Sequence, residues 1–296
     1  LHRVHRRQRQ MCIRDRQGVQ CVGAGRNRIE QLAARGVAKP ARLCFFGSMN
    51  QFGNIKFAEP VEFHVTRSSP CSYRDGLVEQ RLAADISRHS HLHDDLAKAG
   101  FRRVENWVYR PICQHCNACQ PIRIPSGDGQ DGNLIHSRSQ QRVLKANADL
   151  TRRILPNFSR SDHYDLFSKY LNARHGDGQM ADMDQDSYTN MITLSPIETV
   201  LVEYRAGEDL VSVMMVDVQA DGLSAVYSFF DPEIQDRSPG TYMVLDLAAI
   251  AHGMALPYVY LGYYVEDSAK MKYKARFRPA EILQSGEWVT LDDKAR

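Results

Sequence analysis

Strand-like and helix-like hydrophobic patterns alternate through the second half of the chain. Four apolar runs have the length and composition of strands: 199–205, 210–218, 223–230 and 258–265. Apolar residues at helical spacing predict helices over 162–175 and 241–252, and Gly253 ends the second of these. Strands followed by a strand–loop–helix–strand unit indicate a mixed α/β domain, of the α+β kind.

The first half of the chain predicts a helix-and-strand mixture around a group of cysteines. Leucines and alanines at helical spacing predict a helix over 77–99 that stops at Gly100, a residue typical of helix ends. Short strands are predicted over 106–111 and 120–125, on either side of the cysteines. A basic helix is predicted over 138–150, after a turn-rich loop.

Charge divides the chain more sharply than its net value of +3 suggests. Residues 1–48 hold 11 Lys and Arg against two acids, a net +9, whereas the rest holds 27 basic and 33 acidic side chains, a net −6. This leader has no apolar periodicity, so we interpret it as non-native or disordered sequence, with the native start at Met49. We place a domain boundary near residue 155, between an N-terminal domain over 49–155 and a C-terminal domain over 156–296.

Composition excludes several classes of protein. A hydrophobic content of 43% with 25% charged residues is the balance of a globular chain, not of a disordered or fibrous one. The longest uncharged stretch, 247–265, is interrupted by Gly253 and Pro257, whereas a membrane span needs about 20 mostly apolar residues. No secretory signal precedes the cysteines, so we expect reduced thiols and a cytoplasmic protein. The sequence also lacks the short motifs of serine hydrolases, P-loop kinases and zinc proteases.

The first candidate site is a cysteine motif. Cys113, Cys116 and Cys119 follow Cys-x-x-Cys-x-x-Cys spacing, and Cys71 is a fourth thiol distant in sequence. Thiolates at this spacing can converge on one ion from a tight turn, and four of them suit zinc or an iron–sulfur cluster. Reduced thiols packed around strand ends are the alternative, and the motif leaves both interpretations open.

The second candidate is a row of cations at alternate positions: Lys270, Lys272, Lys274, Arg276 and Arg278. In a strand, this spacing places all five on one face, where they would bind phosphates. A lysine-protected edge strand is the alternative, but such protection needs fewer charges. We therefore favour anion binding here, with the basic helix over 138–150 as a second phosphate-binding surface.

The third candidate is the loop before the helix 241–252. Arg237 and Gly240 lie where backbone amides at a helix N-terminus bind anions. The loop is similar to the pyrophosphate loop of N-acetyltransferases of the GNAT fold. Tyr242 replaces a small residue of that loop, however, which puts binding of coenzyme A in doubt. A plain turn with glycine at its bend is the alternative.

Short motifs in unbroken order carry a family resemblance. In the N-terminal half they are SPCSY (69–73), GFRR (100–103), YRP to PIRI (109–124) and SRSQ (137–140). In the C-terminal half they are YLNARH (170–175), SFFDP (228–232), LGYY (261–264) and KMKYKARF (270–277). Together they resemble the bacterial aspartate/glutamate leucyltransferases, which belong with the arginyl-tRNA–protein transferases. The resemblance covers about residues 60–285.

The resemblance implies a reaction and its partners. Such enzymes move leucine from leucyl-tRNA to the α-amine of proteins that begin with Asp or Glu, and the products are passed to the degradation machinery. It implies no organic cofactor and no membrane. It also implies a C-terminal GNAT-like domain with a central, mostly antiparallel sheet, after an N-terminal domain that contains the cysteines.

This chemistry makes modest demands on catalytic groups. The aminoacyl ester is already activated, and an α-amine has a pKa of about 7.7–8.0, so positioning the two substrates can supply most of the rate. Asp231 and Glu266, at the ends of neighbouring strands, are candidates to orient or deprotonate the amine. Tyr227 and Tyr263 are candidates to donate hydrogen bonds to the developing oxyanion. A turn-starting role for Asp231 and plain packing of the tyrosines are the alternatives.

The acidic acceptor calls for a cation, and arginine pairs with a carboxylate through two hydrogen bonds. Four arginines are candidates that the sequence does not rank: Arg103, Arg123, Arg174 and Arg237. Three other functions stay open at this point. They are arginyl transfer, coenzyme-A-dependent N-acetylation, and a metal-containing module that binds nucleic acid without any transfer.

Overall fold

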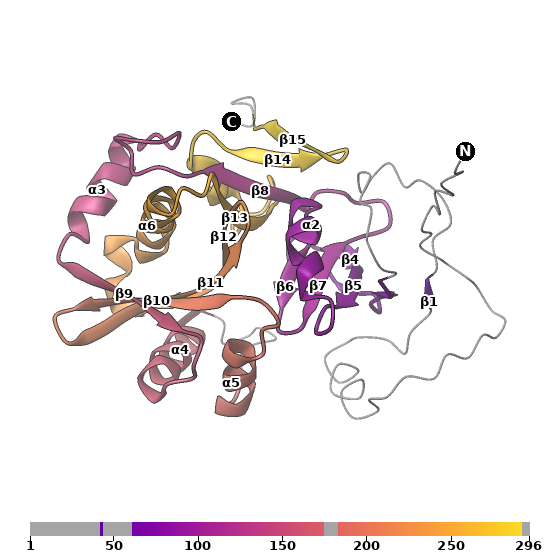
Figure 1. Cartoon of the computed structure of the whole chain (residues 1–296), viewed down its shortest axis with the longest axis horizontal. Coiled ribbons are helices and arrows are strands. Elements are labelled where there is room, and N and C mark those ends of the chain that lie inside the picture. Colours follow the sequence, from indigo (N-terminus) through magenta and orange to yellow (C-terminus); the bar gives the residue numbers. More distant parts are fainter. Residues whose placement is uncertain (1–41, 44–60, 175–182, 292–296) are drawn as a thin grey trace, which may run out of the picture.

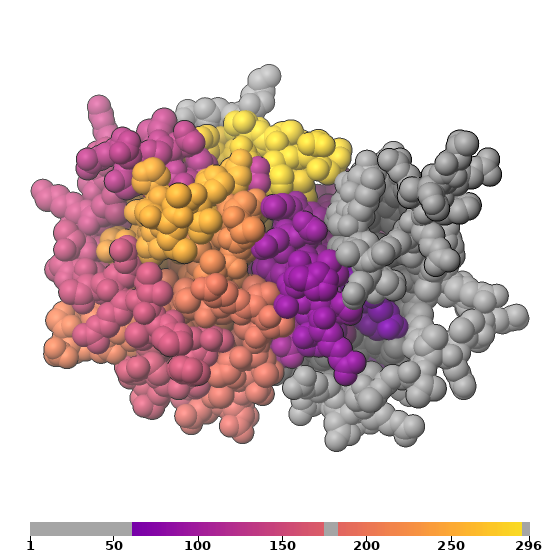
Figure 2. All heavy atoms as spheres, viewed as in Figure 1, coloured from indigo at the N-terminus to yellow at the C-terminus, as the bar shows by residue number. Residues whose placement is uncertain are grey.

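Two β-sheets and the helices packed on them make up the computed structural model, which describes residues 61–174 and 183–291 and the backbone of residues 42–43. A five-stranded sheet has the order β1-β2-β5-β7-β6, and an eight-stranded sheet has the order β15-β14-β8-β13-β12-β11-β10-β9. In Figure 1 the small sheet stands beside the large one. Figure 2 shows the purple residues of the small-sheet part against the orange and yellow residues of the large one.

The small sheet contains β1 (Arg42–Leu43), β2 (Phe63–Val65), β5 (Arg81–Asp85), β6 (Arg102–Val104) and β7 (Trp107–Pro111). Beside it are a two-stranded pair, β3 (Ser69–Pro70) and β4 (Val78–Glu79), and the helices η2 (Ser90–Leu92) and α2 (His93–Lys98). Its apolar core is separate from that of the large sheet and includes Phe63, Leu82 and Leu96.

The large sheet contains β8 (Gln120–Pro125), β9 (Leu150–Pro156), β10 (Thr199–Ala206), β11 (Asp209–Gln219), β12 (Gly222–Phe230), β13 (Tyr258–Tyr264), β14 (Glu281–Gln284) and β15 (Glu287–Thr290). Its helices are α3 (Arg138–Ala146), α4 (Ser161–Arg174), α5 (Gln185–Thr193), η3 (Pro232–Arg237), α6 (Pro239–Gly253) and η4 (Lys272–Arg276). The described strand pairs of this sheet are antiparallel, apart from the parallel pair β12–β13.

The large sheet is covered on both faces along β10 to β13, which explains why these strands are nearly continuous apolar runs. Alternate residues of β11 serve the two faces: Met214 packs in a cluster with α6, and Met215 packs in a cluster with α4 and α5. Figure 1 shows α6 on one side of β10–β13 and α4 with α5 on the other. The mixed α/β class and the mostly antiparallel sheet are therefore confirmed. No helix of the described part is long and apolar enough to cross a membrane.

Most predicted elements of the second half are confirmed within one or two residues. The four predicted strands are β10, β11, β12 and β13, and the two predicted helices are α4 and α6. In the first half, the short strands on either side of the cysteines are β7 and β8. The basic helix is α3, which ends at Ala146 rather than at residue 150. It starts where it does because Ser137 and Gln140 cap each other reciprocally, the side chain of each accepting the backbone N–H of the other.

The helix predicted over 77–99 is wrong for most of its length. Residues 78–79 and 81–85 form β4 and β5, and only 93–98 form the α-helix α2. β5 lies between β2 and β7, and the adjacent Leu82, Ala83 and Ala84 are all buried. Pairing on both edges overrides the helical preference of leucine and alanine. The predicted end at Gly100 is correct, since its φ is +84° and a Cβ there would meet the Pro121 side chain at 2.5 Å.

Three segments that precede residue 155 pack with the large sheet: β8, α3 and most of β9. The domain boundary near residue 155 therefore falls inside β9, and the division into 49–155 and 156–296 stays a prediction. Of the leader, only Arg42–Leu43 is described, as the backbone of β1 paired with β2. The interpretation of residues 1–48 and of a start at Met49 otherwise lies outside the described residues.

Candidate functional site

The large sheet divides between its two parallel strands. β12 and β13 pair only through Gly222–Ser224 and Tyr258–Tyr260. Just beyond this short ladder, β12 has one extra residue relative to β11, and β13 has one extra residue relative to β8. Such bulges bend a strand and end its pairing, and they are frequent near active sites. The carboxyl-terminal halves of the two strands are therefore separate, and we call the space between them the strand split.

Arg102, from β6 of the small sheet, reaches β12 at the strand split. Its Nη2 donates hydrogen bonds to the carbonyl oxygens of Ala225 (2.8 Å) and Val226 (3.1 Å), which no longer face a partner in β13. On β13, Gly262 has a φ of +82°, and a Cβ there would lie 2.2 Å from Nη1 of Arg102. Glycine is therefore required at this position both by the backbone and by the arginine.

Two further polar groups meet on β13 beside the strand split. The Nζ of Lys274 is buried and donates to the carbonyl oxygen of Tyr263 at 2.7 Å. Burial lowers the pKa of Lys274 to about 7, and the positive charge of Arg102 acts in the same direction. The hydroxyl of Tyr263 is buried too, and its one proton is shared between the carbonyl oxygens of Gly100 and Tyr109, each 3.0 Å away.

The four predicted catalytic residues do not share one environment. Asp231 caps η3 by accepting the backbone N–H of Glu233 at 2.9 Å, and it is paired with the Nζ of Lys169 at 2.9 Å. These contacts are those of the turn-starting alternative. Glu266 follows β13 in a turn and is exposed. Tyr263, fully occupied by its two carbonyls, links the strand split to the cysteines.

Tyr227 lies on β12 and packs edge-on against Phe167 of α4, with ring centroids 6.0 Å apart. Its hydroxyl is buried and has no hydrogen-bond partner among the described residues. Burial raises the pKa of Tyr227, so the phenol is neutral and can act as a donor. Among the predicted catalytic side chains, this one keeps an unused hydrogen-bond donor.

The row of cations predicted over 270–278 is not a strand, and this prediction is wrong. Residues 272–276 form the 3₁₀ helix η4, and the buried positions are Lys274, Phe277 and Ala280. A spacing of three matches one face of a 3₁₀ turn, whereas alternation would have buried Tyr273. The charges alternate with a period of two, but the spacing of the buried side chains fits the 3₁₀ turn. Lys270, Lys272 and Arg276 remain exposed, and Lys274 does not share their surface.

Three of the four candidate arginines are paired with acids. Arg103 binds Asp217 through two hydrogen bonds, at 2.6 and 2.7 Å, and Arg123 binds Glu281 at 2.7 Å. Arg237 pairs with Asp149. The fourth, Arg174, stacks over the ring of Phe230, 5.2 Å from its centroid, and forms no ion pair within the described residues. At the helix start, Gly240 is uncrowded, since a Cβ placed there would have only the Phe230 ring within 4 Å.

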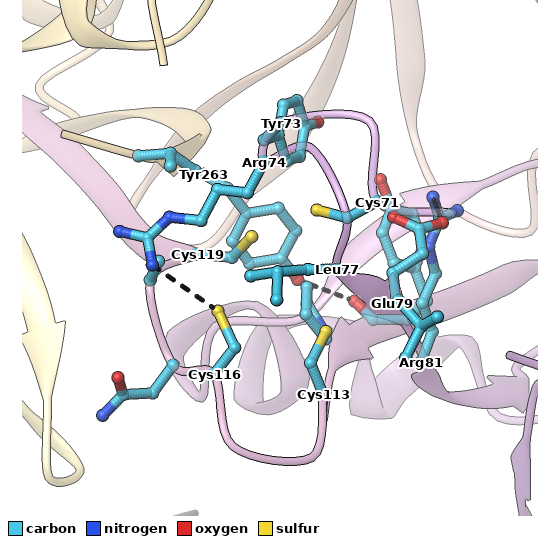
Figure 3. A pocket seen from close by; sticks show the side chains of 16 residues that line it. Cys71, Tyr73, Arg74, Leu77, Glu79, Arg81, Cys113, Cys116, Cys119 and Tyr263 are labelled. Carbon is cyan, nitrogen blue, oxygen red and sulfur yellow. Dashed lines mark hydrogen bonds and ion pairs between the residues drawn. The ribbon is translucent and has the colours of Figure 1, made fainter. Parts of the chain in front are cut away.

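The body of the chain, residues 49–296 after the leader, holds four cysteines. They line one pocket together with Tyr73, Arg74, Glu79, Arg81 and Tyr263. Figure 3 shows all four sulfur atoms directed into the same space. The β3–β4 hairpin holds Cys71, and the loop between β7 and β8 holds the other three. Arg74 connects the pocket to the end of β13, since it donates to the Sγ of Cys116 at 4.0 Å and pairs with Asp267 at 2.5 Å.

The chemistry of this pocket fits a thiolate-bound metal. All four thiols are free, and burial raises the pKa of Cys119 to about 12, with the other three thiols adding to the rise. A cation would reverse this effect by stabilising the thiolates. Within the described residues no three of these sulfurs lie within 4.8 Å of one another. A single zinc ion would bring them to about 3.8 Å, as zinc–sulfur bonds of about 2.3 Å require.

A second cluster of ligand types, Asp162, His163 and Glu203, is neutralised by protein groups. The Nε2 of His163 is 2.8 Å from Glu203, and Arg205 donates hydrogen bonds to both acids, each at 2.7 Å.

Three arginines of the site, Arg102, Arg74 and Arg81, were not predicted from the sequence. The only signal for Arg102 was its place in GFRR, where two adjacent arginines must point to opposite faces of a strand.

Comparison with known proteins matches two segments of a single family. Residues 69–142 match the N-terminal part, and residues 162–284 the C-terminal part, of the arginine-tRNA-protein transferases. Three proteins named aspartate/glutamate leucyltransferase are similar over most of both chains. The protein of Gluconacetobacter diazotrophicus is 44% identical over 79% of this chain and 89% of its own. Those of Afipia carboxidovorans (42%; 78% and 93%) and Nitrosococcus oceani (43%; 78% and 97%) are comparable.

These matches assign the fold and the strand split described above to an aminoacyltransferase that uses aminoacyl-tRNA. The chain belongs to the arginyl-tRNA–protein transferase family, in which the relatives just described are bacterial leucyltransferases.

Proposed function

We propose that this protein transfers leucine from leucyl-tRNA to the N-terminal amine of proteins that begin with Asp or Glu. The observation that carries the proposal is the similarity to leucyltransferases, which spans both matched segments, the second of which contains the strand split. The product acquires a destabilising N-terminal residue and is degraded. The free cysteines agree with a reducing cytoplasm as the place of action.

The transfer needs one bond made and one broken. The acceptor amine attacks the carbonyl carbon of the leucyl ester, the new amide bond forms, and the ester C–O bond breaks. The ribose hydroxyl of the tRNA leaves with the electron pair and takes up the proton lost by the amine. Because the ester is activated, positioning of both substrates at the strand split supplies most of the rate.

Two side chains of the split suit this step. Tyr227, with its unpaired buried hydroxyl, is the proposed donor to the oxyanion. Glu266, exposed at the end of β13, is the proposed group that orients the amine. Asp231 is less suited because Lys169 already neutralises it.

We further propose that the large sheet is GNAT-like. Two parallel strands that separate within an otherwise antiparallel sheet, connected by a helix with a glycine in its first turn, support this. Use of coenzyme A is disfavoured by the helix start: Pro239 has no N–H, and the N–H groups of Thr241 and Tyr242 both donate to Ser238. Few amides remain there for a pyrophosphate.

The cysteine pocket is the proposed metal site, with zinc or an iron–sulfur cluster as occupant. Cys71, Cys113, Cys116 and Cys119 would hold it. When bound, it would tie the β3–β4 hairpin to the loop between β7 and β8 and so stabilise the side of the strand split where Tyr263 lies. Removal of the metal should then lower the stability of the small-sheet part.

The proposed tRNA surface consists of exposed cations near the split. It comprises Lys270, Lys272 and Arg276 around η4, and Arg138, Arg142 and Lys145 on α3. Gln140 of α3 donates to the carbonyl oxygen of Arg276 at 3.2 Å, so the two groups are neighbours. Since residues 49–296 carry a net −6, binding should be local and sensitive to salt.

The test is incubation with leucyl-tRNA or arginyl-tRNA and peptides that begin with Asp, Glu, Asn or Gln, followed by mass spectrometry. We expect leucyl addition to Asp and Glu peptides, with little addition to the amides. A preference for arginyl-tRNA would overturn the leucyl assignment alone. Acetylation of the peptides from acetyl-coenzyme A, without aminoacyl transfer, would overturn the whole proposal.

A further inference from the structure

Within the described residues, the guanidinium of Arg102 donates hydrogen bonds to neutral groups only. Its Nη2 is held by the carbonyl oxygens of Ala225 and Val226, at 2.8 and 3.1 Å. Its Nη1 is buried and has no hydrogen-bond partner within the described part of the chain. Among the ion pairs of residues 61–174 and 183–291, none includes Arg102, so its charge meets no carboxylate there.

A second cation lies close by in the same condition. Lys274 is 7% exposed, and its Nζ donates to the carbonyl oxygen of Tyr263 at 2.7 Å, with the Sδ of Met271 next at 3.7 Å. No acid of the described chain pairs with this ammonium group either. The two cations are near enough that Arg102 disfavours the charged form of Lys274.

Two neighbouring cations in a largely buried place are costly unless an anion joins them. Among the described residues, the two arginines that are fully buried, Arg103 and Arg123, follow this rule, since both pair with acids. The exception occurs at the strand split, where the two substrates are proposed to meet. The uncompensated charge therefore points to an anionic ligand rather than to a structural role.

The surroundings favour a small anion. A carboxylate can pair with a guanidinium through two hydrogen bonds, and Nη1 still has its donors available. A phosphodiester carries bulky ribose on both sides and suits exposed cations such as Lys272. Tyr273 lies beside both cations, with its ring 6.0 Å from the Nζ of Lys274, and is 39% exposed, so it marks the side from which a ligand approaches.

We propose that Arg102 and Lys274 receive the side-chain carboxylate of the acceptor's N-terminal Asp or Glu and so determine acceptor specificity. The proposal rests on the proposed function and replaces the four arginines considered from sequence. Binding of the carboxylate there places the adjacent α-amine at the strand split, near the proposed oxyanion donor Tyr227.

The test compares acceptors that differ only in charge. Arg102→Gln, Arg102→Lys and Lys274→Met are assayed with leucyl-tRNA and two peptides identical except for an N-terminal Asp or Asn. We expect kcat/KM for the Asp peptide to fall about 10- to 100-fold in Arg102→Gln, as loss of a charge-assisted pair predicts. The Asn peptide should change little, so the Asp-to-Asn preference collapses. Arg102→Lys should fall between, and Arg88→Gln, which removes an exposed guanidinium, should match the wild type.

Other outcomes would overturn the inference. An equal fall for both peptides would assign Arg102 to the fold, and a raised KM for leucyl-tRNA would assign the pair to a tRNA phosphate. If the variants do not fold, the wild type still decides: Asp-Ala should raise its melting temperature more than Asn-Ala, and equal shifts would refute the site. A wild type that transfers leucine to no peptide contradicts the proposed function instead.

Discussion

Arg102 and Arg103 are consecutive residues of one strand, yet their surroundings are opposite. Adjacent side chains of a strand point to different faces. Arg103 meets Asp217 of β11 in a two-bond ion pair that also includes Thr199, which donates to Asp217 at 2.8 Å. Arg102 donates to carbonyl oxygens only, as far as the described part of the chain shows its partners. A buried charge with its counter-charge joins the two sheets, whereas a partly buried charge without one is available to a ligand.

The largest expected effect comes from breaking the ion pair between Arg103 and Asp217. Arg103→Met should lower the free energy of unfolding by about 3–5 kcal/mol, since it leaves Asp217 buried and unpaired. Arg102→Gln should cost only about 1 kcal/mol, because it leaves no buried carboxylate behind. Urea denaturation of both variants measures the difference. The double variant Arg103→Met/Asp217→Leu should recover much of the loss; equal losses in the two single variants would contradict the distinction.

Gly262→Ala tests the surroundings of Arg102 from β13, the strand on the other side of the split. The new methyl group would meet both an unfavourable φ of +82° and the Nη1 of Arg102 at 2.2 Å. The backbone alone costs about 1–2 kcal/mol, and the steric overlap should displace the arginine and weaken transfer to an Asp peptide. Gly207→Ala is the matched control, because its φ is +61° and no atom of the described residues would lie within 4 Å of the added Cβ. We expect both to lose stability and only Gly262→Ala to lose acceptor preference.

Secondary structure could be predicted where burial produces a hydrophobic pattern in the sequence, and could not be predicted where burial leaves no such pattern. The strands β10 to β13 are covered on both faces, so their apolar runs were unambiguous. β9 is an edge strand whose residues are mostly exposed, and its sequence carries no such pattern. The alternating cations 270–278 suggested a strand, but residues 272–276 form a 3₁₀ helix, and the buried side chains here and just after it are Lys274, Phe277 and Ala280.

The candidate site shows the same limit. Cysteine spacing predicted which thiols could meet, because residues 113, 116 and 119 are local in sequence and Cys71 was the only other thiol of the body. The Arg102 environment depends on contacts of β6 with β12 and η4, which are more than 100 residues away along the chain. No spacing rule distinguishes Arg102 from Arg103, since the difference is that Arg103 reaches Asp217, whereas Arg102 reaches no acid within the described residues.

His93 tests the surroundings of the Arg103–Asp217 ion pair through the pH dependence of stability. It is buried near Arg103 and Asp217, and burial lowers its pKa from the ordinary 6.5. Below pH 6.5 the unfolded chain therefore binds a proton that the folded chain excludes, and stability falls as pH falls, by at most about 1.4 kcal/mol per unit. His93→Gln should have a flatter profile between pH 6.5 and 5 in urea denaturation. Identical slopes for variant and wild type would remove His93 from this account.

The smallest expected effect concerns exposed charges, which are separate from both Arg102 and Arg103. Lys272→Gln with Arg276→Gln should reduce the dependence of log binding on log salt by about 0.7 for each phosphate that is no longer neutralised, as for single-stranded nucleic acid. Both side chains are exposed beside η4, so stability should stay within about 0.5 kcal/mol of the wild type. Arg153→Gln, on the far edge strand β9, is the control that removes an exposed charge elsewhere. The Asp-to-Asn preference should persist in the double variant, because the cations proposed to hold the tRNA are distinct from Arg102 and Lys274, which are proposed to hold the acceptor. An unchanged salt slope would mean that the exposed cations of η4 do not contact the tRNA, and a lost preference would mean that the two sets are not independent.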